Sequence, residues 1–195
     1  MNKQMPKEDI PSLEQLQTEL HREEYRKKFH RILRSTVSTL LVVSAVAVLV
    51  AVLFLPVLQI YGSSMTPTLQ DGDIVVSVKQ AQFEPGDLIA FYVGNKLLVK
   101  RYIAGPGQWV DIDMDGNVYV DGFLLEEPYV TEKAFGECNI ELPYQVPESH
   151  VFCMGDLRST SVDSRNTAVG SISYEDIVGE IVFRIWPLAT IGSLT

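Results

Sequence analysis

The chain has 195 residues, of which 46% are hydrophobic, and its formal net charge at pH 7 is −9. This length suits one folded domain with appendages, and the composition is not that of a disordered protein. Residues 1–35 hold eight Lys or Arg and six Asp or Glu, whereas the remainder holds eight and nineteen. Because the acidic remainder offers no basic face that could neutralise phosphates, we expect no nucleic-acid partner.

The first 35 residues form a basic arm. Within it, residues 12–34 can form an amphipathic helix with Leu13, Leu16 and Leu20 on one face. We expect this helix to be a solvated arm beside the membrane.

An uncharged, mostly apolar segment follows the arm, from Ser35 to Gln59. A membrane-spanning helix needs about 20 such residues, and residues 36–58 supply them, with Pro56 affecting only the last turn. The alternative is a removable signal peptide, whose apolar region would be about 7–15 residues long behind a short basic head. The longer segment and the long arm favour a permanent anchor in the lipid bilayer.

The flanks of this segment predict its orientation. Six Lys or Arg stand between residues 22 and 34, and the next basic residue after the segment is Lys79. By the positive-inside rule, the N-terminus is cytoplasmic and residues 59–195 lie outside. The sequence therefore predicts a single-pass, type II protein of the cytoplasmic membrane.

Short β segments separated by Gly, Pro and Asp fill residues 59–195. The Asp-Met-Asp-Gly sequence at 113–116 is a strong hairpin signal, and residues 121–149 read as an irregular insertion. We expect a mainly β domain folded into sandwiched or barrel-like sheets. The predicted strands are 73–78, 88–92, 97–102, 109–112, 117–120, 151–154 and 177–186.

The outer domain contains two cysteines, Cys138 and Cys153. They are compatible with one disulfide on an oxidising side of the membrane or with two unpaired buried thiols. With one His beside them, they give no recognisable ligand spacing, so we expect no metal and no cofactor.

Two residues of the outer domain suggest chemistry. Ser64 follows the apolar segment closely, but a serine hydroxyl is a poor nucleophile until a base takes its proton. The one histidine outside, His150, reads as a surface or structural residue. Lys100 lies in an apolar stretch, and burial lowers a lysine pKa from about 10.4 and so favours the neutral amine. Taken singly, Lys100 also fits a solvated strand face and Ser64 a turn.

Five segments in order resemble the motifs of one family, the bacterial type I signal peptidases (leader peptidases) of peptidase family S26. The resemblance covers nearly all of residues 58–192. The segments are Leu-Gln-Ile-Tyr-Gly-Ser-Ser-Met-Thr-Pro-Thr-Leu (58–69), Pro-Gly-Asp-Leu-Ile-Ala-Phe (85–91), Val-Lys-Arg-Tyr-Ile-Ala-Gly-Pro-Gly (99–107), Met-Gly-Asp-Leu-Arg-Ser-Thr-Ser-Val-Asp-Ser-Arg (154–165) and Phe-Arg-Ile-Trp-Pro-Leu-x-x-Ile-Gly (183–192).

The resemblance implies a serine endopeptidase that removes signal peptides from exported preproteins. Ser64 would be the nucleophile and Lys100 the general base, a known variant of the serine triad. Ser161 would hydrogen-bond and orient the lysine, and Asp163 and Arg165 would form a supporting ion pair. Small apolar pockets would favour Ala-like residues one and three positions before the cut, and the residues expected near these pockets are Leu58, Ile60, Leu69 and Leu98.

The chain departs from the family pattern at two positions. Leu157 stands where the family usually has Asn, which puts the geometry of that loop in question. Gly62 stands where some members have a Ser whose hydroxyl helps to hold the oxyanion. The backbone N–H of Ser64 would have to serve, with water or the Gly62 backbone assisting.

Two other classes of protein are alternatives to this interpretation. A self-cleaving Ser-Lys repressor would carry a DNA-binding module and no N-terminal span. A catalytically inactive, membrane-tethered β-domain would bind or scaffold secreted proteins, and the Leu157 departure leaves room for it.

Overall fold

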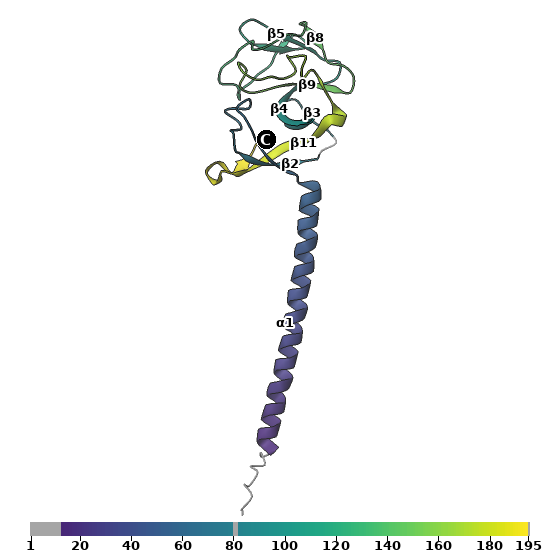
Figure 1. Cartoon of the computed structure of the whole chain (residues 1–195), viewed down its shortest axis with the longest axis vertical. Coiled ribbons are helices and arrows are strands. Elements are labelled where there is room, and N and C mark those ends of the chain that lie inside the picture. The colour runs from purple at the N-terminus through teal and green to yellow at the C-terminus, as the bar shows by residue number, and fades with distance from the viewer. Residues whose placement is uncertain (1–12, 80–81, 195) are drawn as a thin grey trace, which may run out of the picture. The chain divides into compact units, whose positions relative to one another are not determined.

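The computed structural model describes residues 13–79 and 82–194. The chain divides into two compact units between Val50 and Ala51. The first unit contains most of one long helix, and the second contains the β-strands (Figure 1).

The helix, α1, runs from Leu13 to Phe54 without interruption. Its side chains from Leu13 to Val50 are exposed, and it is long and apolar enough to cross a membrane, judged by length and composition. At about 1.5 Å per residue it measures roughly 60 Å, about twice the thickness of a bilayer core.

The helix ends earlier than the predicted boundary at Leu58. Pro56 has no N–H to donate and disfavours helical geometry at Leu55, so α1 ends at Phe54. The next residues form β1 (Val57–Gln59), which pairs with β2 through Leu58 and Val75. Leu58 therefore belongs to the β domain.

The larger sheet has eight strands, and its order is β1-β2-β11-β3-β4-β9-β10, with β12 paired to β11. All its pairings are antiparallel. The strands after β1 are β2 (Ile74–Val78), β3 (Leu88–Val93), β4 (Lys96–Ala104), β9 (His150–Met154), β10 (Ile172–Ser173), β11 (Ile177–Trp186) and β12 (Gly192–Ser193). Two short 3₁₀ turns, η1 (Tyr174–Asp176) and η2 (Leu188–Thr190), flank β11.

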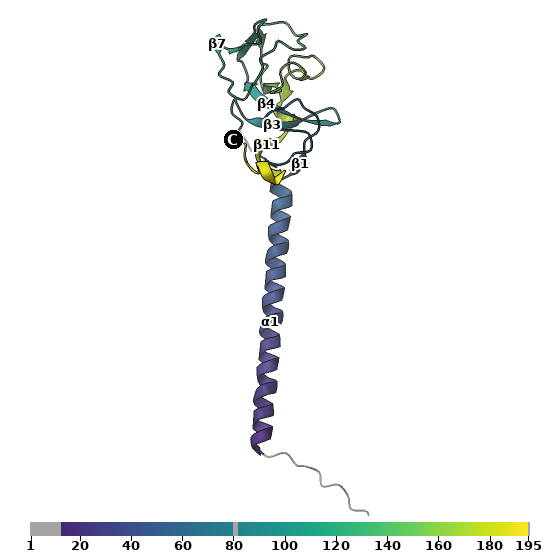
Figure 2. The same cartoon turned by 90° about the vertical axis from the view of Figure 1, so that its left-hand side faces the viewer.

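The smaller sheet has four strands in the order β7-β6-β5-β8, and it lies at the end of the domain away from β1 and β2 (Figures 1 and 2). The predicted hairpin around residues 113–116 is confirmed, because Val110 of β5 pairs with Val120 of β6. The insertion is mostly irregular, as predicted, but it contributes two short strands that the sequence did not indicate. The bounds are β5 (Trp109–Ile112), β6 (Val118–Val120), β7 (Phe123–Leu124) and β8 (Tyr144–Gln145).

The prediction of a mainly β domain behind an N-terminal apolar helix is confirmed. Closure into a barrel is not, because the larger sheet begins at β1 and ends at β10, and these two strands are not paired with each other among the described residues.

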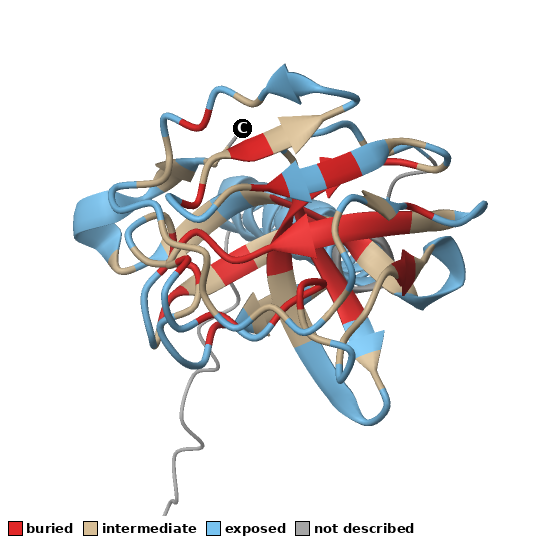
Figure 3. Cartoon of the chain, turned by 90° about the horizontal axis from the view of Figure 1, so that it is seen from above, coloured by how far each residue is buried: buried red, intermediate tan, exposed pale blue. Residues whose placement is uncertain are grey.

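Buried side chains concentrate on the central strands of the β domain (Figure 3). One core cluster includes side chains of the segment that carries Ser64, and Ile181 of β11 is fully buried in this cluster. The other buried members of this cluster are Ile60, Met65, Leu69, Val75, Leu88 and Ala90. The cluster holds β1, β2 and the Ser64 segment against the middle of the sheet.

We predict that Ile181→Ala lowers the free energy of unfolding by about 2–5 kcal/mol, because it leaves a cavity in this cluster. The control is Ile191→Ala, a half-exposed isoleucine, for which we expect a change within about 0.5 kcal/mol. Denaturant unfolding of the detergent-solubilised chain measures both. Equal stabilities of the two variants would mean that this cluster does not support the sheet.

Candidate active site

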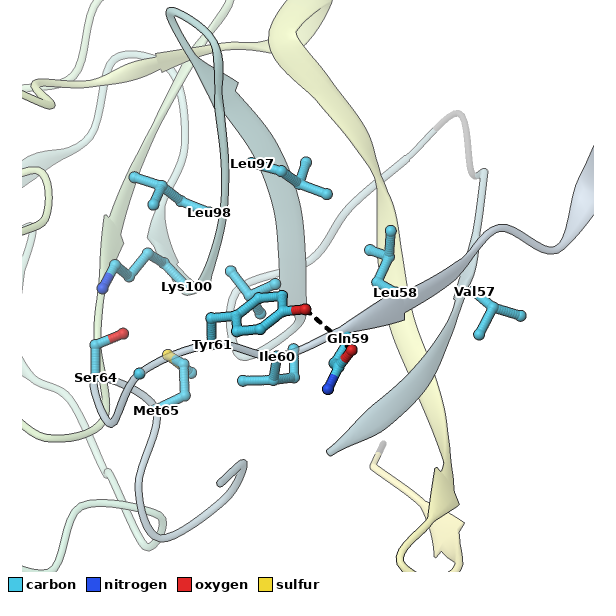
Figure 4. A pocket seen from close by; sticks show the side chains of 12 residues that line it. Val57, Leu58, Gln59, Ile60, Tyr61, Ser64, Met65, Leu97, Leu98 and Lys100 are labelled. Carbon is cyan, nitrogen blue, oxygen red and sulfur yellow. Dashed lines mark hydrogen bonds between the residues drawn. The ribbon is translucent and has the colours of Figure 1, made fainter. Parts of the chain in front are cut away.

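An open pocket lies between the chain around β1 and the first half of β4. Ser64 and Lys100 both line it, and in Figure 4 the Ser64 hydroxyl and the Lys100 amine point toward one another. The remaining lining residues are Val57, Leu58, Gln59, Ile60, Tyr61, Gly62, Met65, Leu97, Leu98 and Val99. The lining is therefore mostly apolar, with the serine and the lysine at one end.

Lys100 lies in the middle of β4, where it pairs with Ile89 of β3. The residue is only 4% exposed. Its Nζ donates a hydrogen bond of 3.0 Å to Ser161 Oγ. Burial lowers the pKa of this amine below its ordinary value, and although the Asp163 carboxylate opposes the shift, the Arg165 guanidinium adds to it.

Smaller influences on the Lys100 amine come from Cys153 and Asp156, which both raise its pKa. Burial outweighs all the groups that oppose it, so the pKa is lowered overall. The arrangement therefore favours a neutral amine, which can accept a proton.

Ser64 is partly buried and lies in the turn between β1 and β2. Its carbonyl oxygen accepts a hydrogen bond of 3.1 Å from the Leu157 N–H. Within residues 13–79 and 82–194, no hydrogen bond joins Ser64 Oγ to Lys100 Nζ. The two groups share one pocket without a direct bond between them.

Asp163 and Arg165 form a fully buried ion pair in which Arg165 Nη2 lies 2.8 Å from Asp163 Oδ2. The same carboxylate oxygen accepts a hydrogen bond of 2.9 Å from the Gly155 N–H. Burial raises the pKa of Asp163, but hydrogen bonds and the charge of Arg165 outweigh burial and hold it below the usual range. The carboxylate therefore stays ionised close to Ser161 and Lys100.

Gly155 lies where the parts of the site come closest. A Cβ at this position would lie 2.6 Å from both the Ser161 Cβ and the Ser64 carbonyl oxygen. Real Cβ atoms do not approach other heavy atoms this closely, so only glycine allows the two serine segments to approach each other here.

The two departures from the family pattern have different consequences. The Leu157 N–H donates to the Ser64 carbonyl and its own carbonyl accepts from the Ser161 N–H, both at 3.1 Å. Leu157 therefore holds the loop through its backbone, which an asparagine would share. By contrast, the Gly62 N–H is engaged by Asp71 Oδ1 at 2.7 Å, so it is not a spare oxyanion donor.

The Ser64 N–H donates no hydrogen bond within the described parts of the chain. It is therefore an unoccupied backbone donor within the Ser64 turn.

Of the residues expected to contact substrate, Leu58, Ile60 and Leu98 line the pocket. Leu69 does not, because it is fully buried in the core cluster with Ile60. The expected substrate contact of Leu69 is corrected to a core role.

A further network was missed by sequence reasoning. Arg101 is bound to Asp156 by two hydrogen bonds, of 2.9 and 2.6 Å, and the Thr68 hydroxyl donates to the same carboxylate. This network joins the segment of Ser64, strand β4 and the loop of Gly155. Its signal in the sequence was that Arg101 directly follows Lys100 and that Asp156 lies in the same motif segment as Ser161.

The remaining candidates lie outside the pocket lining. Cys138 and Cys153 are free thiols, and burial raises the pKa of the Cys153 thiol. His150 is partly buried, and its Nδ1 lies 2.8 Å from the Glu148 carbonyl oxygen. Across residues 13–79 and 82–194 no group of three or more His, Cys, Asp or Glu is placed to hold a metal ion.

Comparison with known proteins identifies the family of the chain. Residues 33–186 match the family described as signal peptidase, peptidase S26, so the chain belongs to this family.

Two of the relatives are named as signal peptidases. The chain is 33% identical over 179 residues to a probable signal peptidase I-1 of Synechocystis sp., covering 84% of this chain and 88% of that protein. It is 35% identical over 150 residues to signal peptidase IB of Staphylococcus aureus, covering 67% and 77%.

A thylakoidal processing peptidase of the chloroplast of Arabidopsis thaliana is 36% identical over 162 residues, which are 72% of this chain and 46% of that protein. The chain thus spans about half the length of this relative. A crystal structure of a signal peptidase I from Enterococcus faecalis aligns with a TM-score of 0.44 at 25% identity, covering 51% of this chain and 96% of that one.

The buried environment of Lys100 generates a prediction about its titration. In ¹⁵N-lysine NMR of the solubilised chain, the Lys100 amine should titrate at a lower pH than it does in the denatured chain. Between the two pKa values the unfolded state binds more protons, so the Lys100 contribution to the free energy of unfolding should rise with pH across that interval. The Lys100→Ala variant assigns the signal, and equal folded and unfolded pKa values would contradict the prediction.

Proposed function

We propose that this protein is a membrane-bound serine endopeptidase that cleaves N-terminal signal peptides from exported preproteins, with Ser64 as nucleophile and Lys100 as general base. The observation that carries the proposal is the Lys100 amine, which is buried, bonded to Ser161 and placed in the same pocket as Ser64. Membership of the signal peptidase family supports the same reaction.

The chemistry follows an acyl-enzyme route. Neutral Lys100 takes the proton of the Ser64 hydroxyl as the oxygen attacks the scissile carbonyl, and the Ser64 N–H stabilises the oxyanion. Protonated Lys100 then gives its proton to the leaving amine. Lys100 then deprotonates a water molecule that attacks the acyl carbonyl, and it returns this proton to the Ser64 oxygen as the ester bond breaks, which releases the acid and restores the Ser64 hydroxyl.

Substrate would bind as an added strand. β9 pairs with β4 from Arg101 to Ala104, whereas residues 96–99 of β4 pair with β3 on one side only. Their other edge has no strand partner among the described residues. An extended peptide can add to such an edge through its main chain, while small apolar pockets beside Leu58, Ile60 and Leu98 would select its side chains.

The place of the site in the chain supports a membrane-associated substrate. About ten residues separate Ser64 from the end of α1 at Phe54, and they cannot span more than about 35 Å. With α1 as a type II anchor and the N-terminus in the cytoplasm, the site would lie outside, close to the bilayer where a signal peptide emerges.

The alternative function, an inactive membrane-tethered scaffold, gains no support from Leu157. The contacts of Leu157 with both serine segments are made by its backbone.

Removal of either dyad residue tests the assignment. Ser64→Ala and Lys100→Ala should each lower the cleavage rate of a purified preprotein by about 10⁴-fold or more, because each removes a group that reacts. Gel analysis with mass spectrometry of the products measures the rate and the cut.

Two matched controls accompany these variants. Ser63 is the exposed neighbour of Ser64, and Lys79 is an exposed lysine that follows strand β2, away from the pocket lining. Ser63→Ala and Lys79→Ala should retain near-normal turnover. Normal turnover by Ser64→Ala or Lys100→Ala would refute the dyad, and intact preprotein with the unmodified enzyme would support the scaffold instead.

The pH dependence of cleavage tests lysine as the base. Below its lowered pKa, Lys100 is protonated and cannot accept the Ser64 proton, so kcat/KM should fall as the pH is lowered. Asp163, which keeps its charge to lower pH, does not compensate. A rate that stays constant from about pH 8 to about pH 5 would exclude lysine as the base.

A further inference from the structure

The irregular insertion, residues 121–149, contacts three buried arginines of the β domain. These arginines come from strand β4 and from the loop that carries Ser161, so the insertion reaches both segments that hold the Lys100 amine. The contacts are Glu127 with Arg158, the Tyr129 ring with Arg101, and the carbonyls of Ala134 and Phe135 with Arg165.

Glu127 and Arg158 form a fully buried ion pair, with both side chains 0% exposed. The pair is bidentate: Arg158 Nη1 donates to Glu127 Oε2 at 3.2 Å, and Nη2 donates to Oε1. A bidentate pair fixes direction as well as distance. The insertion therefore holds Arg158 in one orientation.

Arg158 in turn fixes the loop that carries Ser161. Its Nε donates to the Gly155 carbonyl at 3.0 Å, and its own carbonyl accepts from Arg165 Nη2 at 3.0 Å. The same loop bonds Leu157 to Ser161 through the backbone. A displacement of Arg158 is therefore transmitted to both ends of the loop.

Tyr129, two residues after Glu127, contacts the strand that carries the lysine. Its ring centroid lies 3.8 Å from Arg101 Cζ, a distance typical of a cation–π contact. Arg101 follows Lys100 directly in β4, and its guanidinium holds Asp156. Burial raises the pKa of Tyr129 to about 12, so the ring that covers Arg101 stays neutral.

We propose that the Glu-Pro-Tyr segment, residues 127–129, is a positioning element for the base Lys100. Through Arg158 it fixes the Ser161 loop, and through Arg101 it fixes strand β4, so that the amine stays bonded to Ser161 and shielded from water. This inference rests on the proposed function of Lys100. Neither Glu127 nor Tyr129 touches the reacting atoms.

Because the segment shields the Lys100 amine from water, its loss should change the pH dependence of the rate. Loosening the Ser161 loop admits water to the Lys100 amine, so its pKa rises toward the ordinary value and less neutral amine is present near neutral pH. The other charged or titratable groups that act on the amine are Asp163, Arg165, Cys153 and Asp156, and none of them is substituted in the variant. A variant that merely folds less completely would lower the rate equally at all pH values.

The experiment compares Glu127→Gln with Glu126→Gln in the full chain in detergent. Glu126 is the exposed neighbour of Glu127 and serves as the matched control. For Glu127→Gln we expect kcat to fall by up to about a hundredfold with little change in KM. The acid limb of its pH–rate profile should move to higher pH. Glu126→Gln should match the unmodified enzyme in kcat, in KM and in the position of the acid limb.

Two results would overturn the proposal. One is an unchanged kcat and pH profile for Glu127→Gln. The other is a loss of rate proportional to the unfolded fraction, measured by thermal unfolding, with the acid limb unmoved. Should Glu127→Gln fail to fold, Tyr129→Leu decides by the same pH criterion, because it removes the ring over Arg101 and leaves the buried ion pair intact.

A second readout separates this inference from the proposed function. ¹⁵N-lysine NMR reports the Lys100 pKa without any substrate. A raised Lys100 pKa in Glu127→Gln, relative to the unmodified chain, supports positioning even if the unmodified chain cleaves no preprotein. An unchanged Lys100 pKa overturns positioning even if Ser64→Ala abolishes cleavage.

Discussion

The exclusion of water from one lysine amine is the constraint on which the rest of this structure depends. A buried ammonium group is costly unless it is paired, and the hydrogen-bond partner of the Lys100 amine is a neutral hydroxyl, Ser161 Oγ. The nearby carboxylate of Asp163 forms an ion pair with Arg165 and accepts a hydrogen bond from the Gly155 N–H. The fold thus keeps a counter-charge close to the lysine without giving it a salt bridge of its own.

Keeping the amine dry requires several chain segments to meet closely, and buried ion pairs hold them together. Arg101 joins strand β4 to Asp156, and Arg158 joins the Ser161 loop to Glu127. Arg165 pairs with Asp163 within that loop. Such pairs contribute little net stability, but losing one partner leaves an uncompensated buried charge. They therefore select one arrangement of the loops over others.

Local sequence patterns predicted most of the strands and the Asp-Met-Asp-Gly hairpin, because period, turn residues and apolar runs act over short distances. The end of α1 was predicted at Leu58 instead of Phe54, because hydropathy alone does not indicate that Leu58 pairs with Val75. Ser64 and Lys100 were identifiable from motif positions, but Leu69 could not be separated from its pocket-lining neighbours without coordinates. The sequence did not indicate the contacts of Glu127 and Tyr129, because their partners lie in distant segments and the insertion has no periodic pattern.

The point at which β9 begins to pair with β4 also sets how many main-chain groups a peptide could use there. Among the described residues, the ladder with β9 starts at Arg101, so the unpaired edge of β4 is short and runs from Lys96 to Val99. A peptide added to this edge, as proposed, would form only a few hydrogen bonds, each worth about 1 kcal/mol net. Its backbone would then be held weakly, so selection between peptides would have to come from side-chain contacts, and a cleaved fragment would dissociate easily.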